Sequence, residues 1–244
     1  MKLYRTNIAL ILTALLSVSV SSKAQTTDGR WFAGVQGGTA IGQCTFRSIT
    51  EHKTRLGLQG GIFGGYHINR VLAAEAGITI GHQTQGACDC CPYWLSASGE
   101  RHYAPVIDQQ GAFYADLKAK TAWQRLSLQL DVDLLKLVNR KAQRWSVTLA
   151  PQLAAVHTKT TLKAADSDMD TPWASASQWH LGLGGQLAGG YRVSACIGVQ
   201  LYAGITCMTG SRYDLIPKHG HKSNLIYDGG IRLTYHFSKQ RHEK

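Results

Sequence analysis

Hydrophobic and polar side chains alternate along residues 122–137. From Leu126 to Leu134 every even position is Leu or Val, whereas the odd positions carry Arg125, Asp133 and a second aspartate. A period of two places successive side chains on opposite faces of a strand. The segment is therefore predicted to be a strand with one aliphatic face and one charged face.

Seven further segments show the same alternation. In each, aliphatic and aromatic residues occupy one parity, and Gln, Thr, Gly or charged residues occupy the other. The segments are 31–42, 56–68, 72–81, 145–157, 179–193, 197–207 and 225–237. A strand that crosses a bilayer needs about 9–11 residues, and these segments supply that length.

The connections between the strands differ in length in a regular way. Short turns are expected near Asn69-Arg70, 139–143 and 194–195, and long loops over 43–54, 82–120, 158–178 and 208–223. Short turns at one end and long loops at the other are typical of an up-and-down barrel in an outer membrane. The predicted fold is all-β: an eight-stranded antiparallel up-and-down transmembrane β-barrel over residues 25–237.

The direction of the two faces follows from their chemistry. The aliphatic parity also carries aromatic residues near the strand ends, where membrane interfaces lie; they are Trp31, Tyr66, Trp145, Trp179, Tyr191, Tyr227, Tyr235 and Phe237. A soluble barrel would turn polar residues outward, so this face is predicted to contact lipid.

The charged parity then faces the barrel interior. The predicted interior charge network is Glu75, Arg125, Asp131, Asp133, Arg192, Asp228 and Arg232, with His67, His180 and His236 as further candidates. An eight-stranded barrel has room inside only for side chains. The network is therefore expected to plug the interior, which argues against a general diffusion pore.

The first 24 residues have the pattern of a cleaved signal peptide. Two positive charges in 1–5 precede an apolar run over 8–16, and Ser22-Lys23-Ala24 fits the small-x-small cleavage rule. The run is shorter than the roughly 20 residues of a membrane-spanning helix. Residues 1–24 are thus predicted to direct export.

The chain is basic, with a formal net charge of +11. Export and the lack of an aromatic–basic recognition motif argue against a nucleic-acid partner. An anionic surface such as lipopolysaccharide phosphates is the more natural partner, although scattered solvated lysines are the simpler explanation of the charge. Residues 238–244 are expected to form a basic periplasmic tail.

Several stretches resemble a known class of protein. They are GGIFGGYHINRVLAAEAGI, GGQLAGGYRV, IGVQLYAGIT and YDGGIRLTYHF. These stretches resemble small outer-membrane β-barrels of Gram-negative bacteria, above all the porin-family, PorT-like barrels of Bacteroidetes, with an architecture similar to OmpA and OmpX. The resemblance implies an outer-membrane location with both termini periplasmic. It also implies the barrel-assembly machinery as a partner, which reads a final aromatic such as Phe237, although here the tail follows it.

The cysteines offer a first possible chemistry. Cys44, Cys88, Cys90, Cys91 and Cys207 are expected at the long-loop end, and disulfides are the default in an exported protein. A thiolate metal site that also uses His219 and His221 is a weaker alternative, because C-x-C-C is not a zinc-finger spacing. Cys196 is expected at the opposite end. No metal and no cofactor is predicted.

His221-Lys222-Ser223-Asn224 offers a second possible chemistry. It resembles the His-x-Ser-Asn motif of outer-membrane lipid A deacylases, in which the serine attacks an acyl ester, the histidine is the base and a glutamate orients it. Residues 225–237 hold no glutamate, and their one acid is Asp228.

The preferred prediction is a non-enzymatic barrel, structural or binding in role, whose outer loops, above all 87–112, contact surface ligands or partner proteins. The alternatives are a lipid A-modifying hydrolase that uses Ser223 and His221, and an accessory of a secretion machine that uses the basic tail.

Overall fold

The structure is a computed structural model. It describes residues 30–50, 53–88, 90–96, 98–103, 111–138, 144–164, 174–210, 212–217 and 223–237. The expected signal peptide, the basic tail, His219 and His221 lie outside these residues.

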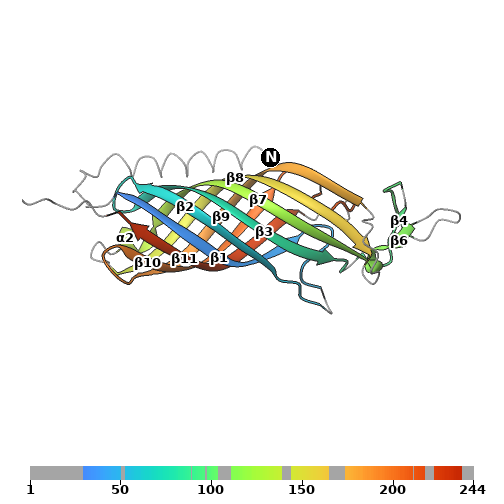
Figure 1. The fold of residues 1–244 in the computed structure, drawn as a ribbon, viewed down its shortest axis with the longest axis horizontal. Helices are drawn as coiled ribbons and strands as arrows, with labels where there is room; N and C mark the ends of the chain where they lie inside the picture. The colour runs from blue at the N-terminus through green and yellow to red at the C-terminus, as the bar shows by residue number, and fades with distance from the viewer. Residues whose placement is uncertain are drawn as a thin grey trace, which may run out of the picture.

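Eight long strands close into one barrel (Figure 1). They are β1 (Trp31–Gln43), β2 (Gly57–His67), β3 (Leu72–Gly86), β7 (Leu117–Asp133), β8 (Trp145–Ala164), β9 (Ala174–Arg192), β10 (Ile197–Met208) and β11 (Asn224–His236). Each pairs antiparallel with its neighbours in chain order, and β1 pairs with β11 to close the ring. The predicted fold, an eight-stranded antiparallel up-and-down barrel, is confirmed.

The barrel is polar inside and apolar outside, as the alternation predicts. Arg125 is 2% exposed, whereas Leu126 and Leu128 on the opposite face of β7 are 54% and 61% exposed. The outward-facing aromatic residues are also exposed, with Trp145 at 65% and Trp179 at 73%. An exposed apolar face that surrounds a polar interior suits a lipid surrounding.

Small residues let bulky ones fit inside the narrow barrel. Phe32 and Phe63 pack together with ring centroids 6.5 Å apart. A side chain at Gly34 would run into the ring of Phe63, and one at Gly65 would run into the ring of Phe32. Glycine at these inward positions is therefore required by close approach.

The strand predicted over residues 122–137 ends earlier than expected. Residues Leu134–Val138 form the short helix α2. The Asp133 carboxylate accepts a hydrogen bond from the backbone N–H of Lys136 at 3.1 Å, which caps the first turn. The cap and the helix-favouring Leu-Leu-Lys-Leu run together end the strand at Asp133. Among the described residues, no helix is long and apolar enough to cross a membrane.

Strands near the long loops run further than predicted. β3 reaches Gly86 rather than residue 81, β7 begins at Leu117, β8 reaches Ala164 and β9 begins at Ala174. The alternation continues there with Lys, Thr, Ser and Gln in place of aliphatic residues, so the sequence pattern is weaker although the backbone pairing persists.

The loop between β3 and β7 holds a small sheet that was not predicted. Strands β4 (Trp94–Ser96), β5 (Arg101–His102) and β6 (Gly111–Phe113) pair in the order β5-β4-β6, followed by the 3-10 helix η1 (Tyr114–Asp116). A buried cluster joins this region to the barrel end; its members include Phe46, Cys90, Leu95, Tyr114, Leu117, Leu162 and Ile216. We call this cluster the cap. Figure 1 shows β4 and β6 beyond the end of the barrel strands.

Candidate functional site

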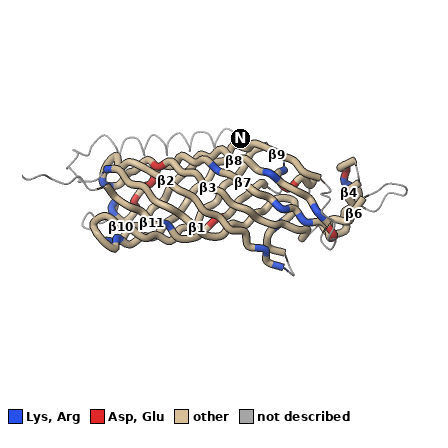
Figure 2. The backbone as a smooth tube through the Cα atoms, viewed as in Figure 1, with Lys and Arg blue, Asp and Glu red and all other residues tan. Residues whose placement is uncertain are grey.

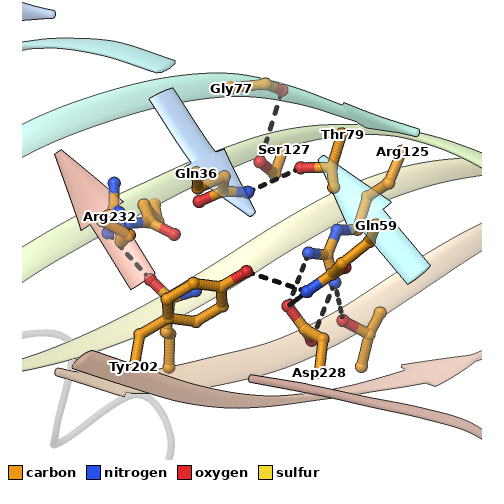
Figure 3. Close-up of polar contacts among 12 residues, drawn as sticks. Gln36, Gln59, Gly77, Thr79, Arg125, Ser127, Tyr202, Asp228 and Arg232 are labelled. Atoms are coloured by element: carbon orange, nitrogen blue, oxygen red, sulfur yellow. Dashed lines mark hydrogen bonds and ion pairs between the residues drawn. The ribbon is translucent and has the colours of Figure 1, made fainter. Parts of the chain in front are cut away.

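An ion pair crosses the middle of the barrel interior (Figure 3). The two Nη atoms of Arg125 on β7 donate to the two carboxylate oxygens of Asp228 on β11, at 3.1 and 2.8 Å. Arg125 Nη1 also donates to Thr206 Oγ1 at 3.1 Å. Gln59 Nε2 donates to the hydroxyl oxygen of Tyr202 at 2.8 Å and to Asp228 at 3.4 Å.

A second buried group lies nearer the short turns. Arg232 on β11 pairs with Glu75 on β3, and its other Nη donates to Gln186 Oε1 at 2.9 Å. Gln129 Nε2 donates to Glu75 at 3.0 Å and to Asp131 at 2.9 Å. The Arg232 guanidinium also lies 3.9 Å from the centroid of the Phe63 ring, in cation–π geometry.

The two remaining members of the predicted network lie at the short-turn end of the barrel. Asp133 forms an ion pair with Lys136 of α2 at 3.0 Å. Arg192 is exposed and lines a cavity of about 90 Å³ at the barrel mouth. His67 and His236 line the same cavity, and their rings stack with centroids 5.5 Å apart.

Uncharged residues complete the interior, and the sequence prediction of the network left them out. Gln59, Gln129, Gln186 and Thr206 stand on the inward parity, yet the predicted network counted charged residues alone. The sequence prediction did not name Tyr202, which is 5% exposed inside the barrel. Its even position on β10, the same parity as Gln200 and the buried Thr206, was the signal that would have found it.

Cys44, Cys88, Cys196 and Cys207 are free thiols in the structure. Cys44 is buried beneath the cap, where its thiol donates to Asn224 Oδ1 at 2.8 Å and lies 3.7 Å from Arg212 Nη1. Burial, reinforced by the charge of Asp214, raises the pKa of Cys44 to about 12. A thiol held in its neutral form is a weak nucleophile and a weak metal ligand.

Three of the other cysteines predicted to form disulfides lie together near the cap, and the fourth lies on β10. Cys90 is buried in the cap, and Cys88 and Cys91 beside it are partly exposed. Cys207 is exposed on the outward parity of β10, opposite in face to the inward Met208. Disulfide formation stays a prediction. Among the described residues, no group of three or more His, Cys, Asp or Glu side chains is placed to hold a metal.

The structure describes half of the His-x-Ser-Asn motif. Ser223 is exposed just before β11, while Asn224 is buried and accepts a hydrogen bond from Cys44. Asp228, the acid nearest in sequence, is engaged by Arg125 inside the barrel. His221 lies outside the described residues.

No protein-family model and no curated protein matches the chain. Solved structures do resemble it. Neisserial surface protein A shares 12% identity at a TM-score of 0.47, covering 87% of this chain and 100% of that one. A major outer membrane protein from Thermus thermophilus shares 11% identity at 0.47, covering 85% and 99%. The attachment invasion locus protein Ail of Yersinia pestis shares 8% identity at 0.42, covering 85% and 99%.

The barrel itself defines the class of protein. It is a closed antiparallel ring of eight strands with a belt of exposed Leu, Ile and Val and a polar interior. The short turns gather at one end and the long loops at the other. These are the features of the small outer-membrane β-barrels, and this chain has their fold.

Proposed function

We propose that this protein is an integral β-barrel of the Gram-negative outer membrane. In this proposal the short turns and both chain termini face the periplasm, the interior is plugged, and the cap and the small sheet above it present a binding surface outside the cell. The single observation that carries the proposal is the reversed polarity of the barrel: exposed aliphatic side chains surround buried ion pairs. Membrane lipids and, during biogenesis, the barrel-assembly machinery are the partners that such a barrel requires.

The interior contacts support the plug. In the barrel order, β7 and β11 are separated by three strands on one side and by three on the other, so they face each other across the lumen. The Arg125–Asp228 pair therefore spans the full width of the barrel, and Arg232–Glu75 crosses it a second time, from β11 to β3. Two such bridges leave little room for a continuous water column in a barrel of this size.

Conductance across a planar lipid bilayer tests the plug. We expect the wild-type barrel to show no stable open channel, and Arg125→Ser combined with Asp228→Ser to raise the ion flux. Arg192→Ser, which changes an exposed residue at the barrel mouth, is the matched control and leaves the flux at the wild-type level. A steady wild-type channel would contradict the plugged interior.

The small sheet above the cap supports an interaction role. Tyr103 is 73% exposed, and its ring packs edge-on against Tyr93 with centroids 5.6 Å apart. The Arg101 guanidinium lies 5.1 Å from the centroid of the Tyr93 ring. Exposed tyrosine and arginine side chains of this kind are enriched at protein interfaces, which favours a ligand or partner protein at this end.

A surface tag tests the orientation. Gly99 lies in the β4–β5 turn at a positive φ of 86°, and a side chain there would meet open space, so an inserted epitope has room. We expect antibody to label this epitope on intact cells. An epitope placed at Ala195, in the turn between β9 and β10, becomes accessible after the outer membrane is opened. The reverse pattern would overturn the proposed orientation.

A further inference from the structure

The outward face of β7 and β8 changes chemistry abruptly along its length. Toward the short turns it is aliphatic, with Leu126 and Leu128 on β7 and Leu153 on β8 all more than half exposed. Toward the long loops the same parity carries four lysines, Lys118 and Lys120 on β7 and Lys159 and Lys163 on β8. Figure 2 shows basic residues gathered along these strands toward the end that carries β4 and β6.

The strand register places the boundary between these two zones. One cross-strand row contains Gln124, His157 and Trp179, from β7, β8 and β9. On the aliphatic side, the next outward row contains Leu126 and Leu181. An exposed tryptophan in the boundary row is typical of a membrane interface.

Beyond that row most of the outward side chains on β3, β7, β8 and β9 are basic or hydrogen-bonding. His82, Ala122, Lys159 and Ser177 form one row across β3, β7, β8 and β9. Thr84, Lys120, Thr161 and Ser175 form the next. The structure describes all eight residues of these two rows, and none of the eight is acidic. Lys120 and Lys159 are both exposed.

A depression of about 500 Å³ lies at the junction of the two zones. Its apolar side is lined by Leu58, Gly60 and Ile80. Gly60 has no side chain, so the outer surface is recessed between the two aliphatic side chains. His157 and Lys159 line its polar side. The depression thus joins an apolar groove to a cluster of hydrogen-bond donors.

We propose that this face binds the phosphorylated headgroup of a glycolipid in the outer leaflet, with the phosphate between Lys120 and Lys159 and an acyl chain in the groove beside Leu58 and Ile80. The site rests on the proposed orientation, which puts the long-loop end in the outer leaflet. Lysines just beyond the hydrocarbon layer attract anionic headgroups by about 1 kcal/mol each. Their stems lie along the barrel wall while the ammonium groups reach the phosphate plane.

Lipid binding to the folded, full-length barrel in detergent tests the site, with bound lipid counted by native mass spectrometry. The probes are bisphosphorylated lipid A, the same lipid without its phosphates, and phosphatidylglycerol. The test variant combines Lys120→Gln with Lys159→Gln. The control combines Lys53→Gln, in the segment before β2, with Arg144→Gln, just before β8, which removes the same charge from exposed positions outside the two rows.

We expect the test variant to bind bisphosphorylated lipid A about 30-fold more weakly than wild type, from two lysines at the stated strength. The control variant should bind bisphosphorylated lipid A as tightly as the wild-type protein does. The wild-type protein should bind lipid A without phosphates more weakly, by a similar factor. Three results would each overturn the site: an equal loss of lipid A affinity in the control variant, equal affinity for lipid A with and without its phosphates, or phosphatidylglycerol bound as tightly as lipid A. Flotation of the same preparations with lipid vesicles separates the two claims: a barrel that fails to insert overturns the membrane function itself, whereas an inserted barrel indifferent to lipid A overturns this site alone.

Discussion

Removing one partner of the Arg125–Asp228 pair should destabilise the barrel strongly. Arg125→Met leaves the Asp228 carboxylate buried, with two of its guanidinium hydrogen bonds gone and the 3.4 Å contact from Gln59 remaining. Breaking a buried pair in this way costs about 3–5 kcal/mol, because an uncompensated charge stays in a dry interior. Asp228→Leu is expected to cost a similar amount by leaving the guanidinium without its carboxylate.

The double variant decides whether this loss reflects the pair. Replacing both charges with apolar side chains of similar size is often neutral, since neither buried charge remains. Arg125→Met combined with Asp228→Leu should therefore recover most of the stability that either single variant loses. The coupling free energy between the two positions is expected to be at least about 3 kcal/mol.

Urea unfolding in lipid vesicles, followed by tryptophan fluorescence, measures these differences. Arg192→Met is the matched control, because that arginine is exposed at the barrel mouth, and its effect should stay within about 0.5 kcal/mol. A loss of less than about 1 kcal/mol in both single variants, or a double variant as unstable as the sum of the two, would refute the reasoning from a buried ion pair.

Gly38→Val should lower the free energy of unfolding by about 2 kcal/mol or more, because a side chain there meets the backbone of β11 where β1 and β11 close the barrel. In the control Gly189→Val the new side chain meets open space, so the heat-modifiable gel band should stay unchanged. The Cys44 thiol, whose pKa is about 12, should resist alkylation at pH 8 until the barrel is unfolded, whereas Cys196 in an exposed turn reacts first; rapid labelling of folded Cys44 would contradict its burial. Lipid A from membranes that contain wild-type protein should match lipid A from membranes that contain Ser223→Ala in its mass spectrum; acyl chains lost with wild type and restored in the variant would make the protein a hydrolase.

The sequence predicts the barrel well because the membrane imposes a strict rule on its strands. Where the outer face contacts lipid, every second residue must be apolar, so Leu126, Leu128 and Leu153 mark their strands unmistakably. Beyond the lipid, that constraint ends. β8 continues through Thr158 to Ala164 with lysines and threonines outside, and the alternation no longer separates a strand from a loop.

Contacts between distant strands lie beyond what alternation can predict. Parity places Arg125 and Asp228 inside, but their pairing depends on the register of seven strand pairs around the ring and on the closing pair β1–β11. Local chemistry also overrides periodicity, as at Asp133, where a capping carboxylate ends a strand that the leucine pattern would continue. The small sheet over residues 94–113 has segments too short for any periodicity to register.

Brominated lipids test most directly whether the barrel carries its aliphatic face outward and its polar face inward. Two single-tryptophan variants are needed, one that retains Trp179, which is 73% exposed on the outer face, and one that retains Trp123, which is 2% exposed inside. Bromine quenches indole fluorescence on contact, so we expect strong quenching of Trp179 and little quenching of Trp123 in inserted barrels. Equal quenching of both, or quenching of Trp123 alone, would contradict the orientation of the two faces on which the proposed function rests.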